Sequence, residues 1–594
     1  MDDILRGLGA FLYERVEGRD LTEILHVEIE KAAPIDDVEW HFHFPSLTRD
    51  PGRPGVLYLA ADQGSDKPAA KLLVFSRGAG GAGAAVECEV RPFAATDRAA
   101  VREFGEKIDR RFLPRPQRDL PAVATGNRHP EISLPAAFAA FGRILGETGV
   151  NMASTVQLSA TREMTTDEAI AARSGDSPTA SGHTRVSIEH LYHCGLWAAI
   201  RCGWRHGYTA EADHFIISGN TAAEIAASTE TTKEAIRRAA GYTKFTTDTS
   251  RMFKLEADQR HPAAWSDAEV DSLFERTLSR EEQKWVLDEF GRAVEIDGYR
   301  YALEPAEIRR LAVKFCESLK LNEELYDFIR EQRQGGEFDF EPSIDEAETL
   351  TTPKELLFYM HWLAARGRAA SLAPPNLGFK KRQAYPETLE SLTGYVHHKM
   401  WPELVPQVER DYQGRPVDEL GARVRELAAV ARHFNGTLSI HSGSGKQARV
   451  LDMIGQATSG RVNYKISGEL QLQLLDVLAE QPAGSRWRTL FERMADGCAA
   501  FAANNAFGGE SALAEEYKQR GLAYSLGDRN KGRVDGNLFQ VFWIGNMVGS
   551  RDVNAPDGDQ RFFKEKIDDL PPKLIAEVRR RNSEYIVWLA RHLR

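Results

Sequence analysis

The sequence predicts an α/β fold, a TIM-like (β/α)8 barrel with a small N-terminal α+β domain, a helical insertion and a C-terminal helical region. Two observations predict this class. From about residue 130 to 480, short apolar runs alternate with helical stretches, and their number favours a closed barrel over a short open sheet. Polar residues also follow several of these runs, which is where barrel enzymes carry catalytic groups. A chain of 594 residues is long enough for the two or three domains that this division requires.

Residues 1–125 are expected to form the small α+β domain. Residues 78–83 match the letters of the dinucleotide fingerprint GxGxxG, but the run after them has a strand pattern. Because the fingerprint needs a helix at that point, we expect a hairpin loop and neither nicotinamide nor flavin. Three prolines, Pro114, Pro116 and Pro121, indicate a linker before the barrel. A helical stretch opens the domain, and strand-like runs typical of hairpins follow at 40–44, 55–59, 71–75 and 85–90.

The barrel is expected to span residues 126–482. A stretch at about 250–335, rich in Glu, Lys and Arg at helical spacing, is predicted to be a helical insertion between two strands. Residues 483–594 are expected to form the C-terminal helical region. The predicted strands lie at 150–157, 207–214, 242–248, 338–346, 370–373, 436–441 and 462–467. Helical patterns between them cover 188–205, 222–240, 354–366, 418–434 and 470–480.

Composition limits the function classes. The formal charge of −11 is spread along the chain without a basic block, so nucleic acid is not an expected partner. Five cysteines, an odd number without CxxC spacing, indicate neither a disulfide framework nor a zinc ribbon and favour a reducing cytoplasm. No basic and apolar leader and no run of about 18 apolar residues occurs, so we expect no signal and no membrane partner. The sequence leaves a homo-oligomer open.

The segment 436–446 carries the strongest functional signal. A short apolar strand ends here and brings His441, Ser442 and Lys446 into one small volume. The letters Gly-Ser-Gly-Lys do not make a nucleotide P-loop, because the residue six before the lysine is Ile440 and the residue after it is Gln. We therefore predict a polar site at the end of this strand rather than a nucleotide site.

A second strand, at 338–346, places several acidic groups on one face. Asp339, Glu341 and Asp345 alternate with apolar residues, and alternate residues of a strand share a face. Charges that a barrel encloses must pair, shift their pKa or bind a metal. Carboxylate and imidazole ligands without a thiolate suit Zn²⁺, Mn²⁺, Ni²⁺ or Co²⁺. The sequence therefore predicts a divalent metal ion in a polar cavity.

At these residues the sequence resembles the tagaturonate/fructuronate epimerase family, which also has relatives that act on tagatose and fructose. The resemblance implies a metal-dependent epimerase on a TIM-like barrel, which inverts one hydroxyl-bearing carbon of a ketohexuronate or a ketohexose. Pro375 stands where the family usually has Arg, a natural clamp for a carboxylate, so the acid and the neutral sugar both stay open. The matching segments are 157–163, 207–214, 245–248, 338–349, 371–373, 438–446 and Lys465 with Gly468.

These patterns together predict the site residues. The metal ligands are expected to be His214, Glu341 and His441. The acid/base candidates are Asp213, Asp248, Asp345 and Glu346, and the candidates for holding substrate oxygens are Gln157, Ser442, Lys446 and Lys465.

Two chemical routes and two other functions stay open. The inverted carbon of such substrates lies β to the ketone, so either retro-aldol cleavage and re-addition or proton transfer by two groups could invert it. A metal-dependent aldolase or a sugar isomerase on the same barrel would share the enediolate intermediate. A sugar-binding relative without turnover is the alternative from outside the enzyme classes.

Overall fold

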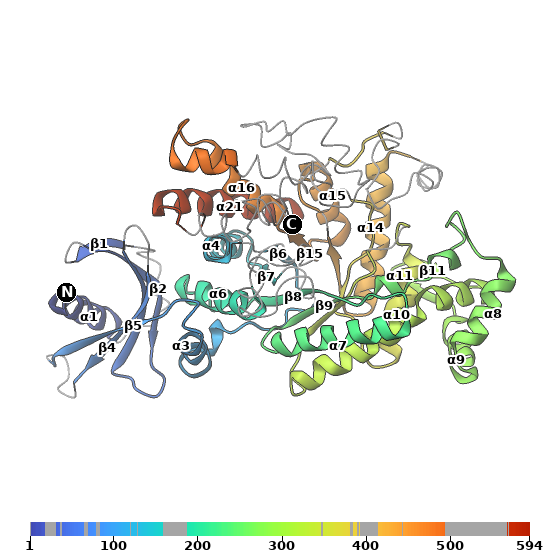
Figure 1. The fold of residues 1–594 in the computed structure, drawn as a ribbon, viewed down its shortest axis with the longest axis horizontal. Helices are drawn as coiled ribbons and strands as arrows, with labels where there is room; N and C mark the ends of the chain where they lie inside the picture. Colours follow the sequence, from blue (N-terminus) through green and yellow to red (C-terminus); the bar gives the residue numbers. More distant parts are fainter. Residues whose placement is uncertain are drawn as a thin grey trace.

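The structure is a computed structural model, and three parts are visible in it: a curved N-terminal sheet, a central barrel and a helical lobe beyond the barrel (Figure 1). It describes residues 2–17, 31–35, 38–64, 69–78, 84–118, 120–126, 129–157, 187–345, 349–379, 384–388, 391–392, 414–441, 443–493, 567 and 569–594.

The N-terminal part is an antiparallel sheet that curves around one helix (Figure 1). Helix α1 (Asp2–Val16) turns Leu5, Leu12 and Val16 into a core that it shares with the inner faces of the strands. These positions lie three to four or seven residues apart, as one face of a helix requires. The five strands lie in chain order as β1 (Lys31–Ile35), β2 (Val38–Arg49), β3 (Val56–Gln63), β4 (Ala69–Arg77) and β5 (Val86–Pro92).

Eight parallel strands form the central barrel. They follow one another around the ring in chain order, and the strand pairings along the sheet are parallel. The ring closes between its fifth and sixth strands, where the Ser371 N–H donates to the Phe340 carbonyl at 2.8 Å. The strands are β6 (Ala122–Gly126), β7 (Ala153–Gln157), β8 (Thr209–Ile216), β9 (Lys244–Asp248), β12 (Asp339–Pro342), β13 (Leu372–Ala373), β14 (Thr437–Ile440) and β15 (Val462–Ile466). This confirms the predicted TIM-like fold class.

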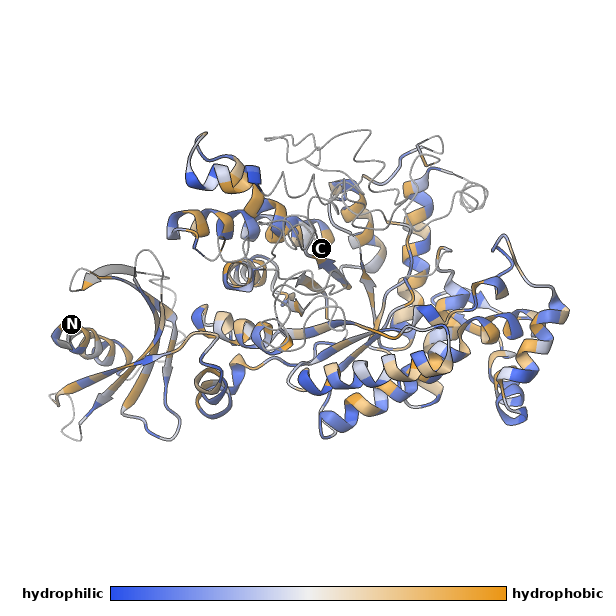
Figure 2. Ribbon diagram, in the orientation of Figure 1, coloured by the Kyte–Doolittle hydropathy of each residue, from blue (hydrophilic) through white to orange (hydrophobic). Residues whose placement is uncertain are grey.

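Helices with one apolar face surround the barrel. Figure 2 shows their hydrophobic sides turned toward the strands and their hydrophilic sides turned outward. Local sequence fixes several starts, for example the capping boxes of Thr221 with Glu224 and of Thr352 with Glu355. The helices that follow the strands are α4 (Pro130–Thr148), α6 (Ile188–Arg201), α7 (Ala222–Arg238), α10 (Pro305–Gln332), α11 (Pro353–Ala365), α14 (Pro416–His433), α15 (Ala448–Thr458) and α16 (Gly468–Ala479).

The predicted insertion between β9 and β12 is the helical lobe. It opens with two short helical turns, η4 (Ser250–Met252) and η5 (Leu255–Ala257), and a small hairpin precedes its long helix α10. The cluster of Asp258, Arg260, Lys314 and Glu355 joins the lobe to the barrel helix α11 through ion pairs of 2.6 to 3.0 Å. The other elements are α8 (Asp267–Thr277), α9 (Arg280–Phe290), β10 (Val294–Ile296) and β11 (Tyr299–Tyr301).

The N-terminal sheet is tied to the end of α6. Arg205 donates to Asp109 at 3.0 Å and to the carbonyls of Pro45 and Leu47, both also at 3.0 Å. Between sheet and barrel lie α3 (Arg98–Glu103), a π-helical turn η2 (Phe104–Ile108) and a 3-10 turn η3 (Arg110–Phe112).

The first barrel strand, β6, was not among the predicted strands. It spans the boundary expected at residues 125 and 126, so the barrel starts earlier than the sequence indicated. The linker before β6 closes the N-terminal end of the barrel, because the N–H groups of Gln117 and Arg118 each donate to Asp339 at 2.9 Å. Asp339 is therefore on the inner face as predicted, but at the end of the barrel opposite to the predicted site.

At the C-terminus, helix α21 (Pro572–Leu593) packs against α4, α15 and α16. Its last turn passes so close to Gly455 of α15 that a Cβ there would lie 2.9 Å from the His592 carbonyl oxygen. Much of the predicted C-terminal helical region, including Trp543, lies outside the described residues. Within the described part of the chain, no helix has both the length and the apolar character needed to span a bilayer.

Candidate active site

A β-bulge in β8 brings two consecutive polar side chains into the barrel. Neighbouring residues of a regular strand point to opposite faces. The pairing of β8 with β9 shifts between Ala212 and Phe215, and His214 has a φ of 52°. The extra residue lets Asp213 and His214 both contribute to the interior cluster, while Phe215 packs outward against Phe245. Such a left-handed conformation costs a non-glycine residue about 1–3 kcal/mol and is most often kept at functional sites.

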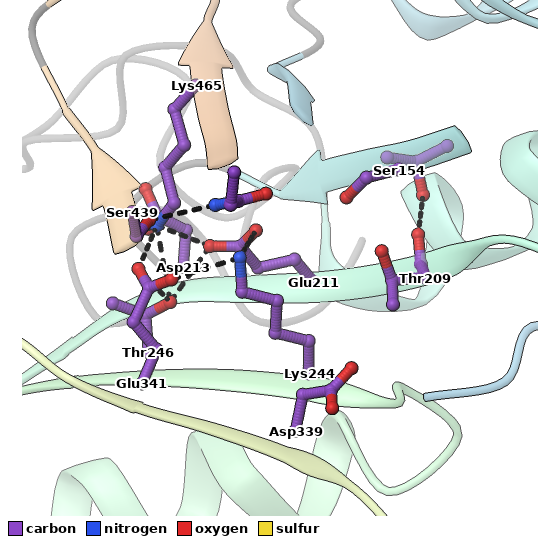
Figure 3. Close-up of polar contacts among 12 residues, drawn as sticks. Ser154, Thr209, Glu211, Asp213, Lys244, Thr246, Asp339, Glu341, Ser439 and Lys465 are labelled. Carbon is purple, nitrogen blue, oxygen red and sulfur yellow. Dashed lines mark hydrogen bonds and ion pairs between the residues drawn. The ribbon is translucent and has the colours of Figure 1, made fainter. Parts of the chain in front are cut away.

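Lys465 of β15 is at the centre of the site (Figure 3). Its Nζ lies 2.7 Å from Asp213 Oδ1 and 2.6 Å from Glu341 Oε1, and it also forms an ion pair with Glu211. Thr246 of β9 donates from Oγ1 to Glu211 Oε1 at 2.8 Å. Three carboxylates from two strands thus converge on one ammonium group.

A second lysine, Lys244, neutralises charge on two of these carboxylates from the side of the N-terminal end of the barrel. Lys244 Nζ lies 2.7 Å from Glu211 Oε2 and 3.0 Å from Glu341 Oε2, and its side chain is only 2% exposed. Figure 3 shows Lys244 between this cluster and Asp339. Burial raises the pKa of Asp339 to about 6, although two backbone N–H groups lower it. The polar interior therefore extends from the linker end of the barrel to its carboxyl end.

Two carboxylate–imidazole pairs lie above the lysine. His441, which follows β14, has Nδ1 2.9 Å from Asp345 Oδ2 and Nε2 2.8 Å from Glu341 Oε1. His214 has Nδ1 3.5 Å from Asp248 Oδ2 and Nε2 3.8 Å from Asp213 Oδ1. The two imidazole rings meet edge to face with their centroids 5.5 Å apart. Each histidine thus has a carboxylate at Nδ1 and directs Nε2 toward the centre of the site.

The charges in the site hold one another ionised. Burial alone would lower the pKa of Lys465, but Asp213, Glu211 and Glu341 raise it well above its ordinary value. Burial likewise disfavours the charged form of His441, but Asp345 raises its pKa to about 9. Burial would raise the pKa of Asp213, whereas His214 and Lys465 lower it to about 2. Attractive ion pairs therefore outweigh desolvation at each of these groups.

The structure gathers most of the predicted site residues. His214, Glu341 and His441 lie together, with Asp213, Asp248, Asp345 and Lys465 in contact with them. Lys446 is buried in the loop after His441, where its Nζ lies 5.1 Å from the centre of the Phe379 ring. Glu346 and Ser442 lie outside the described residues, and Gln157 ends β7 with a side chain that is not described.

Sequence reasoning missed Glu211, Lys244 and Thr246. Glu211 and Thr246 lie inside strands and Lys244 begins one, so none of them is at the carboxyl end of a strand, but alternation offered a signal. Glu211 has the same parity as Asp213, and Lys244 and Thr246 have the same parity as Asp248.

One donor set among the described residues of this site brings its ligand atoms close enough together to hold a metal ion. Glu211, Asp213 and Glu341 are completely buried or nearly so, and each offers a carboxylate oxygen within 4.8 Å of the others. The predicted set of His214, Glu341 and His441 shares only Glu341 with it. The acidic set already surrounds the Lys465 ammonium group, whereas the predicted set includes two imidazoles that face inward.

The fold and the site together define a class, a (β/α)8-barrel protein with a buried charged centre at the carboxyl ends of its strands, the arrangement that barrel enzymes use. Comparison with known proteins narrows the class. Residues 174–399 match the family described as UxaE, tagaturonate epimerase. Over these residues the match agrees with the family resemblance that the sequence predicted.

Individual relatives agree with this assignment. The chain is 24% identical to the tagaturonate/fructuronate epimerase of Thermotoga maritima over 285 residues, which span 48% of this chain and 49% of that relative. The glycerol-complexed crystal structure of the fructuronate-tagaturonate epimerase UxaE from Cohnella laeviribosi has the same fold. The TM-score is 0.64 at 17% identity, and the match covers 96% of this chain and 98% of that one. The native structure of that protein gives a TM-score of 0.61 at 16% identity.

Proposed function

We propose that the protein is an isomerase that epimerises a hydroxyl-bearing carbon of a keto-sugar acid of the tagaturonate/fructuronate type. The match of residues 174–399 to the family and the similar relative support the reaction class. The single observation that carries the proposal is the Lys465 ammonium group, held by three carboxylates below two carboxylate–histidine pairs. A positive charge of this kind would stabilise the negative oxygen of an enediolate, which both retro-aldol cleavage and proton transfer require.

We propose that a divalent ion is held by His214, Glu341 and His441. Their ligand atoms would draw together on binding, because they are not among the donor sets of the described residues that already lie within 4.8 Å of one another. Two imidazoles bound through nitrogen to one tetrahedral ion have ring centroids roughly 5 Å apart, and the rings of His214 and His441 lie 5.5 Å apart. Histidines that bind a metal commonly donate their other N–H to a carboxylate, and Asp248 and Asp345 stand at that position. When bound, the ion would supply Lewis-acid polarisation of a substrate oxygen.

The acidic set is the poorer place for the ion. Lys465 contacts Glu211, Asp213 and Glu341, and Lys244 contacts two of them. A divalent ion among these three carboxylates would lie next to both ammonium groups and repel them. In the histidine set only Glu341 forms ion pairs with the lysines, and the imidazoles bind the ion as neutral ligands once it displaces the proton that Asp345 holds on His441.

Other residues of the site would bind the substrate and transfer protons. Because its pKa is raised, Lys465 stays an ammonium group, so it donates a hydrogen bond to a substrate oxygen instead of attacking the ketone as an amine. Asp213 accepts from Lys465 and lies 3.8 Å from the inward-facing Nε2 of His214, so it is the acid/base candidate that faces the centre of the site. The contacts of Asp248 and Asp345 favour an orienting role for these two over the acid/base role considered first.

Lys446 is the candidate for the substrate carboxylate. It is buried at the carboxyl end of β14, on the loop that His441 begins, which is the end of the barrel where barrel enzymes bind their substrates. This assignment favours the keto-sugar acid over the neutral ketose despite Pro375, since it places a lysine on the substrate side in place of the arginine.

Metal removal and reconstitution test the proposal. The purified protein is stripped with a chelator, and activity on a ketohexuronate and a ketohexose is followed by chromatography of the products. We expect activity to disappear and to return with Zn²⁺, Mn²⁺, Ni²⁺ or Co²⁺, and His441→Ala to abolish this return. His361→Asn is the matched control, because His361 pairs with Glu289 on α9 in the helical lobe.

Other outcomes would contradict the proposal. Full activity in the metal-free protein would refute the requirement for a metal ion. Binding of a sugar without any product would support the alternative of a sugar-binding protein without turnover. Cleaved fragments as end products support an aldolase. Deuterium uptake from solvent would separate proton transfer from retro-aldol cleavage.

A further inference from the structure

A second group of metal-binding side chains lies outside the barrel mouth, where helices α4 and α6 begin. Glu131, in the first turn of α4, has Oε1 2.6 Å from His190 Nε2 of α6. The Cys194 sulfur lies 3.3 Å from the same His190 nitrogen and 3.9 Å from the Glu131 oxygen. One oxygen, one nitrogen and one sulfur donor therefore face one another within 4.8 Å.

Local structure explains why the three groups meet. His190 and Cys194 are four residues apart on α6, so they lie on the same face. Ser187 caps this helix by accepting a hydrogen bond from the His190 N–H at 3.0 Å, which fixes the start of the face. Glu131 arrives from α4, which packs against α6. The thiol is buried, whereas the side chains of His190 and Glu131 are 18% and 47% exposed, so the donors can be reached from solvent.

We propose that Glu131, His190 and Cys194 bind a zinc-like divalent transition-metal ion at a site separate from the barrel mouth. Donor atoms at the usual Zn–S, Zn–N and Zn–O lengths around a tetrahedral ion are roughly 3.3–3.6 Å apart. The three separations here, 2.6, 3.3 and 3.9 Å, bracket that range, so small side-chain movements create the geometry. A sulfur ligand selects Zn²⁺ over Mg²⁺ or Ca²⁺, and three protein ligands leave a fourth position for water.

The site would connect the first two helices of the barrel. α4 follows β6 and α6 follows β7, and the three ligands lie in or next to the first turns of both helices. No zinc motif in the sequence indicates this site. His190 and Cys194 have the spacing His-x3-Cys, and the third ligand, Glu131, lies 59 residues upstream of His190. The bound ion would bridge α4 and α6 beside the strands that support the active site.

Cobalt spectroscopy tests the site in the full-length protein. The protein is stripped with a chelator, kept reduced and titrated with Co²⁺. We expect a thiolate-to-cobalt charge-transfer band in the near ultraviolet that saturates at one equivalent. His214, Glu341 and His441 contain no sulfur, so an ion held by them gives no such band, and His441→Ala should retain it. Failure of the proposed epimerase function would therefore leave this result unchanged.

Variants decide between the site and an ordinary hydrogen-bonded cluster. Cys194→Ser should lose the band, while Cys202→Ser should keep it, because the Cys202 sulfur lies by the Pro135 carbonyl at the other end of α6. Buried thiols can be needed for folding, so Glu131→Gln at the surface is a second check. In that variant, we expect an unchanged circular-dichroism spectrum and a Kd for Co²⁺ at least tenfold higher. No band in the wild type, a band in Cys194→Ser or an unchanged Kd in Glu131→Gln would overturn the proposal.

Discussion

Removal of the Lys244 charge should destabilise the barrel strongly. In Lys244→Met, Glu211 and Glu341 keep their buried charges and lose partners at 2.7 and 3.0 Å. At an effective dielectric constant of 20, each pair is worth at most about 6 kcal/mol. Lys465 still compensates both carboxylates, and one of them can take up a proton, so only part of that energy is lost. Removing one partner of a buried ion pair typically costs about 3–5 kcal/mol, which is the loss that we expect in the free energy of unfolding.

Urea unfolding followed by circular dichroism measures this loss as a lower transition midpoint. The matched variant is the double substitution Lys244→Met with Glu211→Gln. The second change removes one of the two carboxylate charges that Lys244→Met leaves without its lysine partner. We expect the double variant to be more stable than Lys244→Met alone, with a coupling energy of about 2 kcal/mol or more in the double-mutant cycle. A loss below about 1 kcal/mol in Lys244→Met, or additive effects of the two changes, would show that the pair is not the compensation described here.

Three further results are expected. Burial would raise the pKa of Asp62, but Arg201 and His43 hold it well below its ordinary value. The contribution of Asp62 to the free energy of unfolding is thus present above about pH 4 and lost as pH falls further. In Asp62→Asn, the melting temperature measured by calorimetry should therefore fall less between pH 4 and lower pH than in the wild type. Gly455→Ala should lower the melting temperature, because its Cβ meets the backbone of α21, whereas Gly142→Ala on α4 has open space and should not. Lys465→Met should reduce kcat about 10²- to 10³-fold in steady-state assays with the fold retained, and near-normal turnover would exclude it as the oxyanion donor.

Much of the fold follows from the sequence because the barrel repeats one local pattern. Seven of the eight strands were predicted from apolar runs between helical stretches, and each is parallel to its neighbours. The eighth, β6, escaped because Ala-Val-Ala-Thr-Gly holds one branched aliphatic residue and follows a proline-rich linker. Its burial comes from the ring around it, and no five-residue window contains that information.

The site was predictable where alternation holds and unpredictable where it fails. The inward positions of Glu341, His441 and Lys465 follow from period-two patterns. The joint placement of Asp213 and His214 depends on a bulge whose signal is a backbone angle, not a residue type. The pairing of charges between strands distant in the sequence, such as β8 and β15, exists only once the ring closes.

The charge of the site would couple binding of the proposed divalent ion to binding of the proposed substrate. Counted together, the carboxylates of the site outnumber its two lysines by three, so the centre stays negative unless protons or a divalent ion are added. These carboxylates are Glu211, Asp213, Asp248, Glu341 and Asp345. A keto-sugar acid adds one more negative charge and a neutral ketose adds none. Saturation with metal should therefore tighten the binding of a ketohexuronate at least tenfold more than that of the matching ketohexose, measured by calorimetry on His214→Gln and wild-type protein. Equal tightening of both sugars by metal, or the same preference in His214→Gln, would separate the cation from the substrate carboxylate and refute this reasoning.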